Sequence, residues 1–256
     1  MRVPVGRYGE DLLTATLQTQ ADLLITARAA YRAGDFETSY AAFSRAGAVG
    51  PLALDDLDAM ATSAARLGHG REATRVGELV YVRLARTDPS TAAAKAVELG
   101  SLWLSRGEVA AGQTWTRRAR GLLAEAAGSS LSVRLANLEN AVAAFAAYAA
   151  VSSETARAQM WAAIAVADSD DAPRLTRGAA RIALAAGDLD EVEQYLRRLS
   201  TVAVEDHVLR GAVLVRRGRY REALTVLHTA LRESRYQATE VYEWIADAHR
   251  GLAKGG

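Results

Sequence analysis

The sequence predicts an all-α fold, a right-handed α-solenoid in which helical hairpins stack side by side. The main observation is a repeated turn, where an apolar, helix-like run ends on a glycine and a polar residue follows. This turn occurs at Gly34, Gly68, Gly107, Gly187 and Gly218. The intervals between these glycines are 34, 39, 80 and 31 residues, and 80 residues leave room for two hairpins. Abundant alanine, only 4 prolines and 6% aromatic residues also favour helices over strands.

We expect a single repeat domain of six hairpins followed by a capping helix. The hairpins are predicted at residues 18–51, 52–88, 89–128, 129–170, 171–203 and 204–235, and the capping helix at residues 236–253. The first unit is the most complete, because Gly34-Asp35-Phe36 supplies the turn and Pro51 ends the second helix. The unit at 129–170 lacks a glycine turn, and its register stays open. There we expect a turn at Ser152-Ser153, with Glu154 capping the next helix.

The last expected helix is amphipathic. Its apolar residues recur at helical spacing, and they are Val241, Trp244, Ile245, Ala248 and Leu252. One apolar face and one polar face suit a helix that covers the last hairpin of an array.

Residues within the hairpins resemble the tetratricopeptide repeat (TPR), a helix-turn-helix unit of about 34 residues. The first unit has small and large residues where the TPR pattern has them, at Ala27, Gly34, Phe43 and Pro51. The third unit contains Leu99-Gly100-x-x-Trp103, which matches the leucine-glycine-aromatic element of the pattern. The resemblance implies a curved array whose first helices line a concave surface, and such a surface recognises partners rather than catalysing a reaction.

Longer stretches are similar to the helical-repeat regions of bacterial LuxR-type transcription regulators. The similarity lies in residues 27–125, 181–190, 209–218 and 236–251. This resemblance implies a regulatory role, in which the superhelix holds a ligand or a partner protein. The sequence lacks the G-x-x-x-x-G-K-[ST] loop and the helix-turn-helix of those regulators, so the resemblance does not extend to DNA binding.

Composition excludes several classes of function. The formal net charge of +1 over 256 residues gives no overall attraction for nucleic acid or an anionic membrane. The absence of cysteine excludes disulfides and thiolate metal sites and indicates a cytoplasmic location. No segment reads as a signal peptide, and the longest apolar run, 141–151, is far shorter than the roughly 20 residues of a membrane span. Lys95 and Lys254 are the only lysines among 31 basic residues, and this arginine bias suggests a bacterial genome rich in G and C.

The sequence contains no catalytic or metal-binding constellation, so we predict neither an enzyme nor a cofactor. The four histidines lie in separate units without metal-ligand spacing, and they are His69, His207, His228 and His249. His69 is expected in a solvated turn and His207 as a partly buried packing residue. The four tryptophans are expected at seams between helices, with an aromatic binding cage as the alternative, and they are Trp103, Trp115, Trp161 and Trp244.

Arginines gather at the positions that the resemblance assigns to the concave surface. Arg174, Arg177 and Arg181 follow one helical face, and Arg28 and Arg32 form an i, i+4 pair. The candidate partner-binding residues are Arg28, Tyr31, Arg32, Arg66, Arg174, Arg177, Arg181 and Arg216. Guanidinium groups bind carboxylates in two-pronged geometry, so this surface suits an acidic peptide, a chain terminus or a small anionic ligand. The alternative is that nearby Asp and Glu residues pair with these arginines on a solvated face.

We therefore expect a non-enzymatic scaffold or regulatory module whose concave groove binds a segment of a partner protein. A small-ligand sensor domain of a LuxR-type transcription regulator is the alternative. A second basic cluster consists of Arg216, Arg217, Arg219 and Arg221. No series of stacking aromatic residues accompanies this cluster apart from Tyr220, so direct nucleic-acid binding is not expected.

Overall fold

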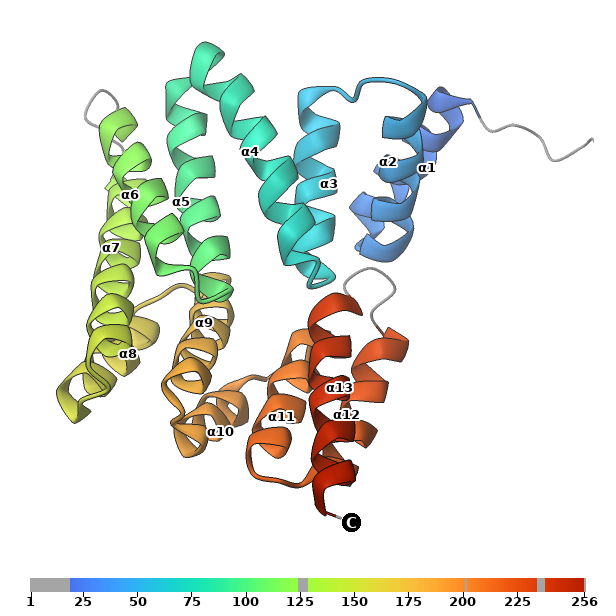
Figure 1. Ribbon diagram of the computed structural model, residues 1–256. Coiled ribbons are helices and arrows are strands. Elements are labelled where there is room, and N and C mark those ends of the chain that lie inside the picture. The colour runs from blue at the N-terminus through green and yellow to red at the C-terminus, as the bar shows by residue number, and fades with distance from the viewer. Residues whose placement is uncertain (1–18, 124–128, 201, 234–237, 256) are drawn as a thin grey trace, which may run out of the picture.

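A computed structural model describes residues 19–123, 129–200, 202–233 and 238–255 (Figure 1). Within these ranges the secondary structure consists of thirteen α-helices and no strands, which confirms the predicted all-α fold. The first six helices are α1 (Gln20–Ala33), α2 (Phe36–Val49), α3 (Leu54–Arg66), α4 (Gly70–Thr87), α5 (Pro89–Ser105) and α6 (Val109–Leu123). The remaining seven are α7 (Ser129–Ala150), α8 (Glu154–Ala165), α9 (Asp171–Ala186), α10 (Leu189–Arg198), α11 (Val204–Arg216), α12 (Tyr220–Glu233) and α13 (Ala238–Gly255).

The turn glycines end one helix and allow the next to begin. All five have a φ between 73° and 83°, in the left-handed region where a Cβ atom is unfavourable. Gly34 caps α1 by donating its N–H to the carbonyl oxygens of Ala30 and Tyr31. The side chain of Asp35 then accepts a hydrogen bond from the N–H of Thr38 and begins α2. A glycine followed by a polar residue therefore ends one helix and begins the next.

The hairpin formed by α7 and α8 uses a serine in place of a turn glycine. The Ser153 hydroxyl accepts a hydrogen bond from the N–H of Ala156 at 3.2 Å and is the N-cap of α8. The expectation that Glu154 caps this helix is wrong, because Glu154 is its first helical residue. A serine hydroxyl is short enough to reach the first free N–H groups, while a glutamate in the first turn interacts favourably with the helix dipole.

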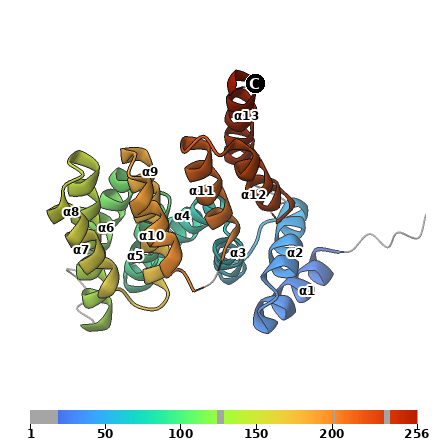
Figure 2. The ribbon, with the colours of Figure 1, turned by 90° about the horizontal axis from the view of Figure 1, so that it is seen from below.

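The hairpins form a row that turns back on itself. In Figure 1, α1 to α6 run across the top, α7 and α8 lie at the left, and α9 to α13 return beneath them. Figure 2 shows the same return from below. Successive odd-numbered helices contact one another and form the inner layer of this solenoid. Because the row turns back, the α3–α4 turn reaches α11 and α13.

Helix α9 packs directly against α5, two hairpins earlier in the chain. A Cβ atom at Gly178 would lie 2.1 Å from the carbonyl oxygen of Leu104, so the close approach requires glycine. The buried Ser101 hydroxyl donates a hydrogen bond to the carboxylate of Asp171 at 2.7 Å in the same contact. Through this contact, the inner helices of the third and fifth hairpins touch each other directly.

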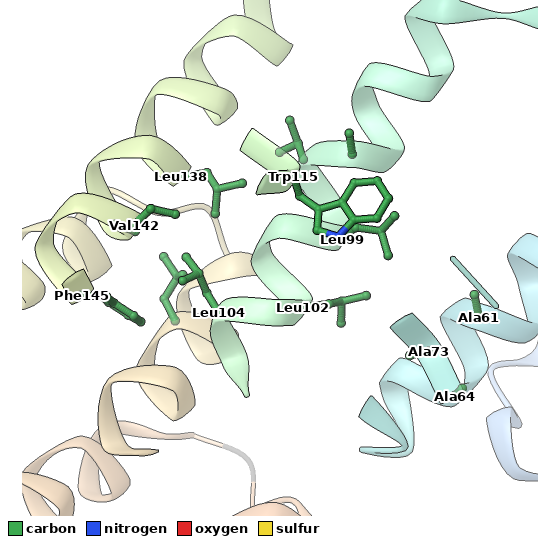
Figure 3. Close-up of a cluster of buried hydrophobic side chains, with 14 of the residues drawn as sticks. Ala61, Ala64, Ala73, Leu99, Leu102, Leu104, Trp115, Leu138, Val142 and Phe145 are labelled. Carbon is green, nitrogen blue, oxygen red and sulfur yellow. The ribbon is translucent and has the colours of Figure 1, made fainter. Parts of the chain in front are cut away.

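The buried apolar side chains form two clusters. The larger one extends from α1 to α11, and Figure 3 shows part of it, with Leu104 of α5 facing Val142 and Phe145 of α7. The smaller cluster lies entirely within α11, α12 and α13, and its buried members are Val208, Val215, Ala223, Leu227, Ala230, Val241 and Ala248. Helix α11 also contributes Leu209 and Val213 to the larger cluster, so it connects the two.

The tryptophan side chains lie between helices. Trp103 of α5 donates its indole N–H to Glu78 of α4 at 3.2 Å. Trp115 packs edge-on against Tyr81 with ring centroids 4.8 Å apart, and the ring of Trp161 stacks on that of Tyr195 at 4.2 Å. The guanidinium of Arg216 lies 5.8 Å from the centre of the Trp244 ring. The indoles therefore serve as packing residues between neighbouring helices.

His69 differs from the expectation of a solvated turn residue. Its side chain is buried, with 7% exposed, and its ring packs edge-on against Tyr40 at a centroid distance of 5.0 Å. Burial lowers the pKa of His69, while the charges of Glu72 and Glu37 act in the opposite direction. The turn is buried because the returning C-terminal helices cover it, a contact that the local sequence does not reveal.

Candidate functional site

The structure divides the eight predicted partner-binding residues among separate places. Arg28, Tyr31 and Arg32 line an open groove of about 690 Å³ between α1 and α3. We call it the α1–α3 groove, and its other lining residues are Phe43, Ala53, Asp55, Asp56 and Ala59. The remaining five arginines lie along α3, α9 and α11.

Arg28 is held by a carboxylate of the next hairpin. Its Nε and Nη2 donate hydrogen bonds to the two carboxylate oxygens of Asp56 at 2.7 and 2.8 Å. This hydrogen bonding raises the pKa of Arg28. The Asp56 side chain is 4% exposed and that of Arg28 is 53% exposed, so Arg28 remains accessible to solvent, and its Nη1 takes no part in the two hydrogen bonds to Asp56.

Arg32 lies one helical turn further along the same wall of the groove. Its Nε donates to the carbonyl oxygen of Arg28 at 3.2 Å, and its guanidinium contacts no carboxylate among the described residues. Tyr31, between the two arginines in sequence, packs edge-on against Phe36 at 6.1 Å. Exposed Asp55 lies on the opposite wall, on α3. The groove therefore has a basic wall and an acidic wall.

Arg177 and Arg181 point from α9 into contacts with the C-terminal helices. Arg177 donates through Nε and Nη2 to the two oxygens of Asp206 on α11 at 2.8 and 3.1 Å, and both side chains are largely buried. Arg181 donates through Nη1 to Glu240 on α13 at 2.8 Å. These two arginines connect helices of the same chain in this structure.

The other three predicted arginines also have neighbours within the chain. Arg174 lies 3.5 Å from the carboxylate of Asp171, and Arg66 lies 3.7 Å from that of Asp170. Arg216 covers the Trp244 ring. The structure thus brings together only Arg28, Tyr31 and Arg32 on one open surface.

The carboxylates that face these arginines were missed in the sequence, and they are Asp56, Asp206 and Glu240. A signal for two of them exists. Asp56 and Asp206 both occupy the third position of an inner helix, and each lies 28 or 29 residues after its arginine. The stretches Ala53-Leu54-Asp55-Asp56 and Ala203-Val204-Glu205-Asp206 are correspondingly alike.

The second basic cluster is partly neutralised. Arg217 pairs with Asp190 at 2.5 Å and with Glu193 at 2.8 Å, and Arg219 donates its Nε to Glu222 at 2.7 Å. These ion pairs leave fewer guanidinium groups for phosphate contacts than the sequence suggests.

Two further properties of the described residues bear on function. No three histidine, cysteine, aspartate or glutamate side chains there are grouped so that they could hold a metal ion. None of the helices in the described part of the chain combines the length and the apolarity that crossing a membrane requires.

Comparison with solved structures finds similar helical arrays. A tetratricopeptide repeat protein from Parabacteroides merdae aligns with a TM-score of 0.50 and 13% sequence identity, over 92% of this chain and 86% of that chain. The TPR domain of P58(IPK) aligns with a TM-score of 0.45 and 12% identity, over 92% of this chain and 66% of that chain. The TPR2AB domain of yeast Sti1, in a complex with pHSP90, gives a TM-score of 0.37 and 14% identity, over 90% of this chain and 98% of that chain.

No protein-family model and no curated protein matches the sequence. The likeness to the Parabacteroides merdae protein therefore concerns the fold alone. The fold is a right-handed α-solenoid of TPR-like helical hairpins, as predicted.

Proposed function

We propose that the chain is a non-enzymatic scaffold that binds a segment of a partner protein in the α1–α3 groove. The observation that carries the proposal is Arg32, an exposed arginine with no carboxylate partner among the described residues, beside Tyr31 in an open groove. TPR-like arrays present extended surfaces of this kind to other proteins. We infer a partner rather than a substrate, because the groove holds no nucleophile paired with a base.

The chemistry of the groove defines the segment it suits. Arg32 presents its guanidinium to solvent, and Arg28 retains its Nη1 edge after pairing with Asp56. Two guanidinium edges one helical turn apart suit a carboxylate, either an Asp or Glu side chain or a chain terminus. Asp55 on the opposite wall favours a basic or polar residue in the same segment and disfavours a run of acidic residues.

A peptide panel tests this proposal. Peptides that vary in the position of a carboxylate are screened by fluorescence anisotropy against the wild-type chain, and the strongest is then measured against Arg32→Ala. We expect enrichment of peptides with a single carboxylate and a loss of affinity of at least about tenfold for Arg32→Ala, as for a charged hydrogen-bonded contact. Arg45→Ala, which changes an exposed arginine of α2 away from the groove, is the matched control and should leave binding unchanged.

Two results would contradict the proposal: no preference for carboxylate-bearing peptides, or equal affinity for the wild type and Arg32→Ala. The sensor alternative, which the resemblance to LuxR-type regulators implies, predicts that a small anion stays bound to the purified chain. Native mass spectrometry would detect such an anion directly. The regulatory role, the bacterial origin and the cytoplasmic location stay predictions from the sequence.

A further inference from the structure

The returning C-terminal helices meet the second hairpin at a small polar interface, which we call the seam. It encloses a cavity of about 30 Å³. The seam is lined by Leu67, Gly68 and His69 of the α3–α4 turn, Arg181 of α9, Val204, Glu205 and Val208 of α11, and Glu240 and Val241 of α13. The two halves of the row therefore touch here through charged and apolar groups around an incompletely filled space.

Three charged side chains line the seam, and they are Arg181, Glu205 and Glu240. Arg181 and Glu240 form an ion pair at 2.8 Å, with 19% and 42% of their side chains exposed. Glu205 lies over the α3–α4 turn, where a Cβ atom at Gly68 would be 3.6 Å from its Cγ and Cδ. Burial raises the pKa of Glu205, so the closed seam holds a carboxylate that would be better solvated in water. Arg106 approaches the same turn, 3.4 Å from a Cβ atom at Gly70.

Helices α11, α12 and α13 have an apolar core of their own. The seven buried residues of the smaller cluster all come from these helices. Their attachment to the rest of the protein has two parts. In the first part, the largely buried Arg177–Asp206 pair connects α9 to α11, and Leu209 and Val213 of α11 belong to the larger cluster. The seam is the other attachment, and it is the more exposed and less well packed of the two, because its ion pair is more accessible to solvent and a cavity lies beside it.

We propose that the seam is a reversible latch. Helices α11 to α13 pivot together on the contact between α9 and α11, the Arg181–Glu240 ion pair separates, and Arg181 becomes accessible on the inner face. In the closed seam Glu240 occupies the place where a partner's carboxylate would bind, so the closed seam is an autoinhibitory contact for Arg181. The latch is a property of the fold and holds whether or not the α1–α3 groove binds a partner.

Because the sequence contains no cysteine, spin labels can be placed at two chosen positions and the distance between them measured. Spin labels are attached to Arg71→Cys on α4 and Tyr242→Cys on α13, two exposed positions on opposite sides of the seam. Double electron–electron resonance then gives the distribution of distances between the labels. A second pair, Gln113→Cys on α6 and Ala185→Cys on α9, is the control, because both helices contribute to the larger cluster.

We expect a main short distance and a minor longer one across the seam. Glu240→Gln should increase the longer population several-fold, and so should raising the salt concentration to about 1 M, which screens a partly exposed ion pair. Glu243→Gln, which changes an exposed glutamate on the same helix, should leave the distribution unchanged. The control label pair should show one distance under every condition.

The latch requires that both Glu240→Gln and high salt increase the population with the longer distance. An unchanged distribution for Glu240→Gln, or no salt response of the wild-type sequence carrying the two labels, overturns the latch. The salt measurement uses native seam residues, so the test remains decisive even where the substitution disturbs α13. Equal lengthening in the control pair would show general unfolding and would also overturn the proposal.

Discussion

Single residues set how closely the inner helices approach, and Gly178 is the clearest case. The position that its missing Cβ would occupy lies 2.1 Å from the carbonyl oxygen of Leu104 and 2.8 Å from the carbonyl carbon, both backbone atoms. Backbone atoms of a packed helix cannot move aside as the end of a flexible side chain can. The contact between α5 and α9 therefore depends on one missing methyl group.

Gly178→Ala should destabilise the protein strongly. We expect a loss of at least about 3 kcal/mol in the free energy of unfolding, because α5 and α9 must separate to admit the methyl group. Urea denaturation followed by circular dichroism measures the loss. Gly121→Ala is the matched control in α6, since a Cβ atom there would meet nothing within 4 Å. This control should raise stability by up to about 1 kcal/mol through helix propensity.

Glu205 makes stability depend on pH. Burial raises its pKa in the folded protein above the ordinary value of 4.5, so its favourable contribution is complete below pH 4.5 and is lost as the pH rises through the raised value. At about pH 7.5 the ionised carboxylate is therefore a cost. Glu205→Gln should raise the melting temperature at that pH, and the gain should shrink as the pH falls toward 4.5. Thermal melts across this range test the sign, and a gain that is constant with pH would contradict it.

Among the helices, the inner layer is held by arginine–aspartate pairs that recur between hairpins. Arg28 binds Asp56 between α1 and α3, and Arg177 binds Asp206 between α9 and α11. In both pairs the carboxylate lies near the start of the later helix, where it also favours the helix dipole. The pairs differ in solvation, because the arginine is 53% exposed in the first and 12% exposed in the second.

This difference in solvation predicts which arginine substitution destabilises the protein more. Arg177→Met should cost about 3 to 5 kcal/mol, because it leaves the carboxylate of Asp206 buried without its partner. Arg28→Met should cost distinctly less, since water can reach Asp56 once the exposed arginine is gone. Chemical denaturation of the two variants side by side gives the comparison. Equal losses would mean that solvation does not decide the strength of these pairs.

At the level of helices and hairpins, the sequence is a good guide where the signal is local. Gly34 and Gly187 mark helix ends because their positive φ is sterically favourable only for a residue without a Cβ atom. The sequence predicts the turn at Ser152-Ser153 but assigns the cap to Glu154, whereas the N-cap in the structure is Ser153. Helical spacing predicts that Arg174, Arg177 and Arg181 share one face of a helix. It does not predict the carboxylates that pair with Arg177 and Arg181, because each lies on another helix and its position depends on how neighbouring hairpins stack.

For the whole molecule, the return of the row at α7 and α8 is the feature that repeat spacing does not predict. Each hairpin rotates slightly relative to the last, and the sum of these rotations decides which distant helices meet. The contact of Gly178 with Leu104 and the burial of His69 both follow from that sum. The sequence therefore predicts the repeats but not the seam.

The two apolar clusters predict uneven stability. Amides of α11, α12 and α13 that depend on the smaller cluster should exchange with solvent through a partial opening, at a free energy at least about 1 kcal/mol below that of α5. Hydrogen exchange measured at low denaturant concentrations resolves such openings. Uniform protection of Leu227 in α12 and Leu99 in α5 would indicate one cooperative unit instead.

The direct contact between α5 and α9 also determines how the molecule responds to tension. An array whose hairpins touch only their neighbours extends like a spring, one unit after another. Here the third and fifth hairpins contact each other directly through α5 and α9. When the chain is pulled, we expect this contact to resist the separation of the hairpins that it joins. In an optical trap the C-terminal helices should release first in a short step at low force, and the segment from α5 to α9 should rupture later in one long step.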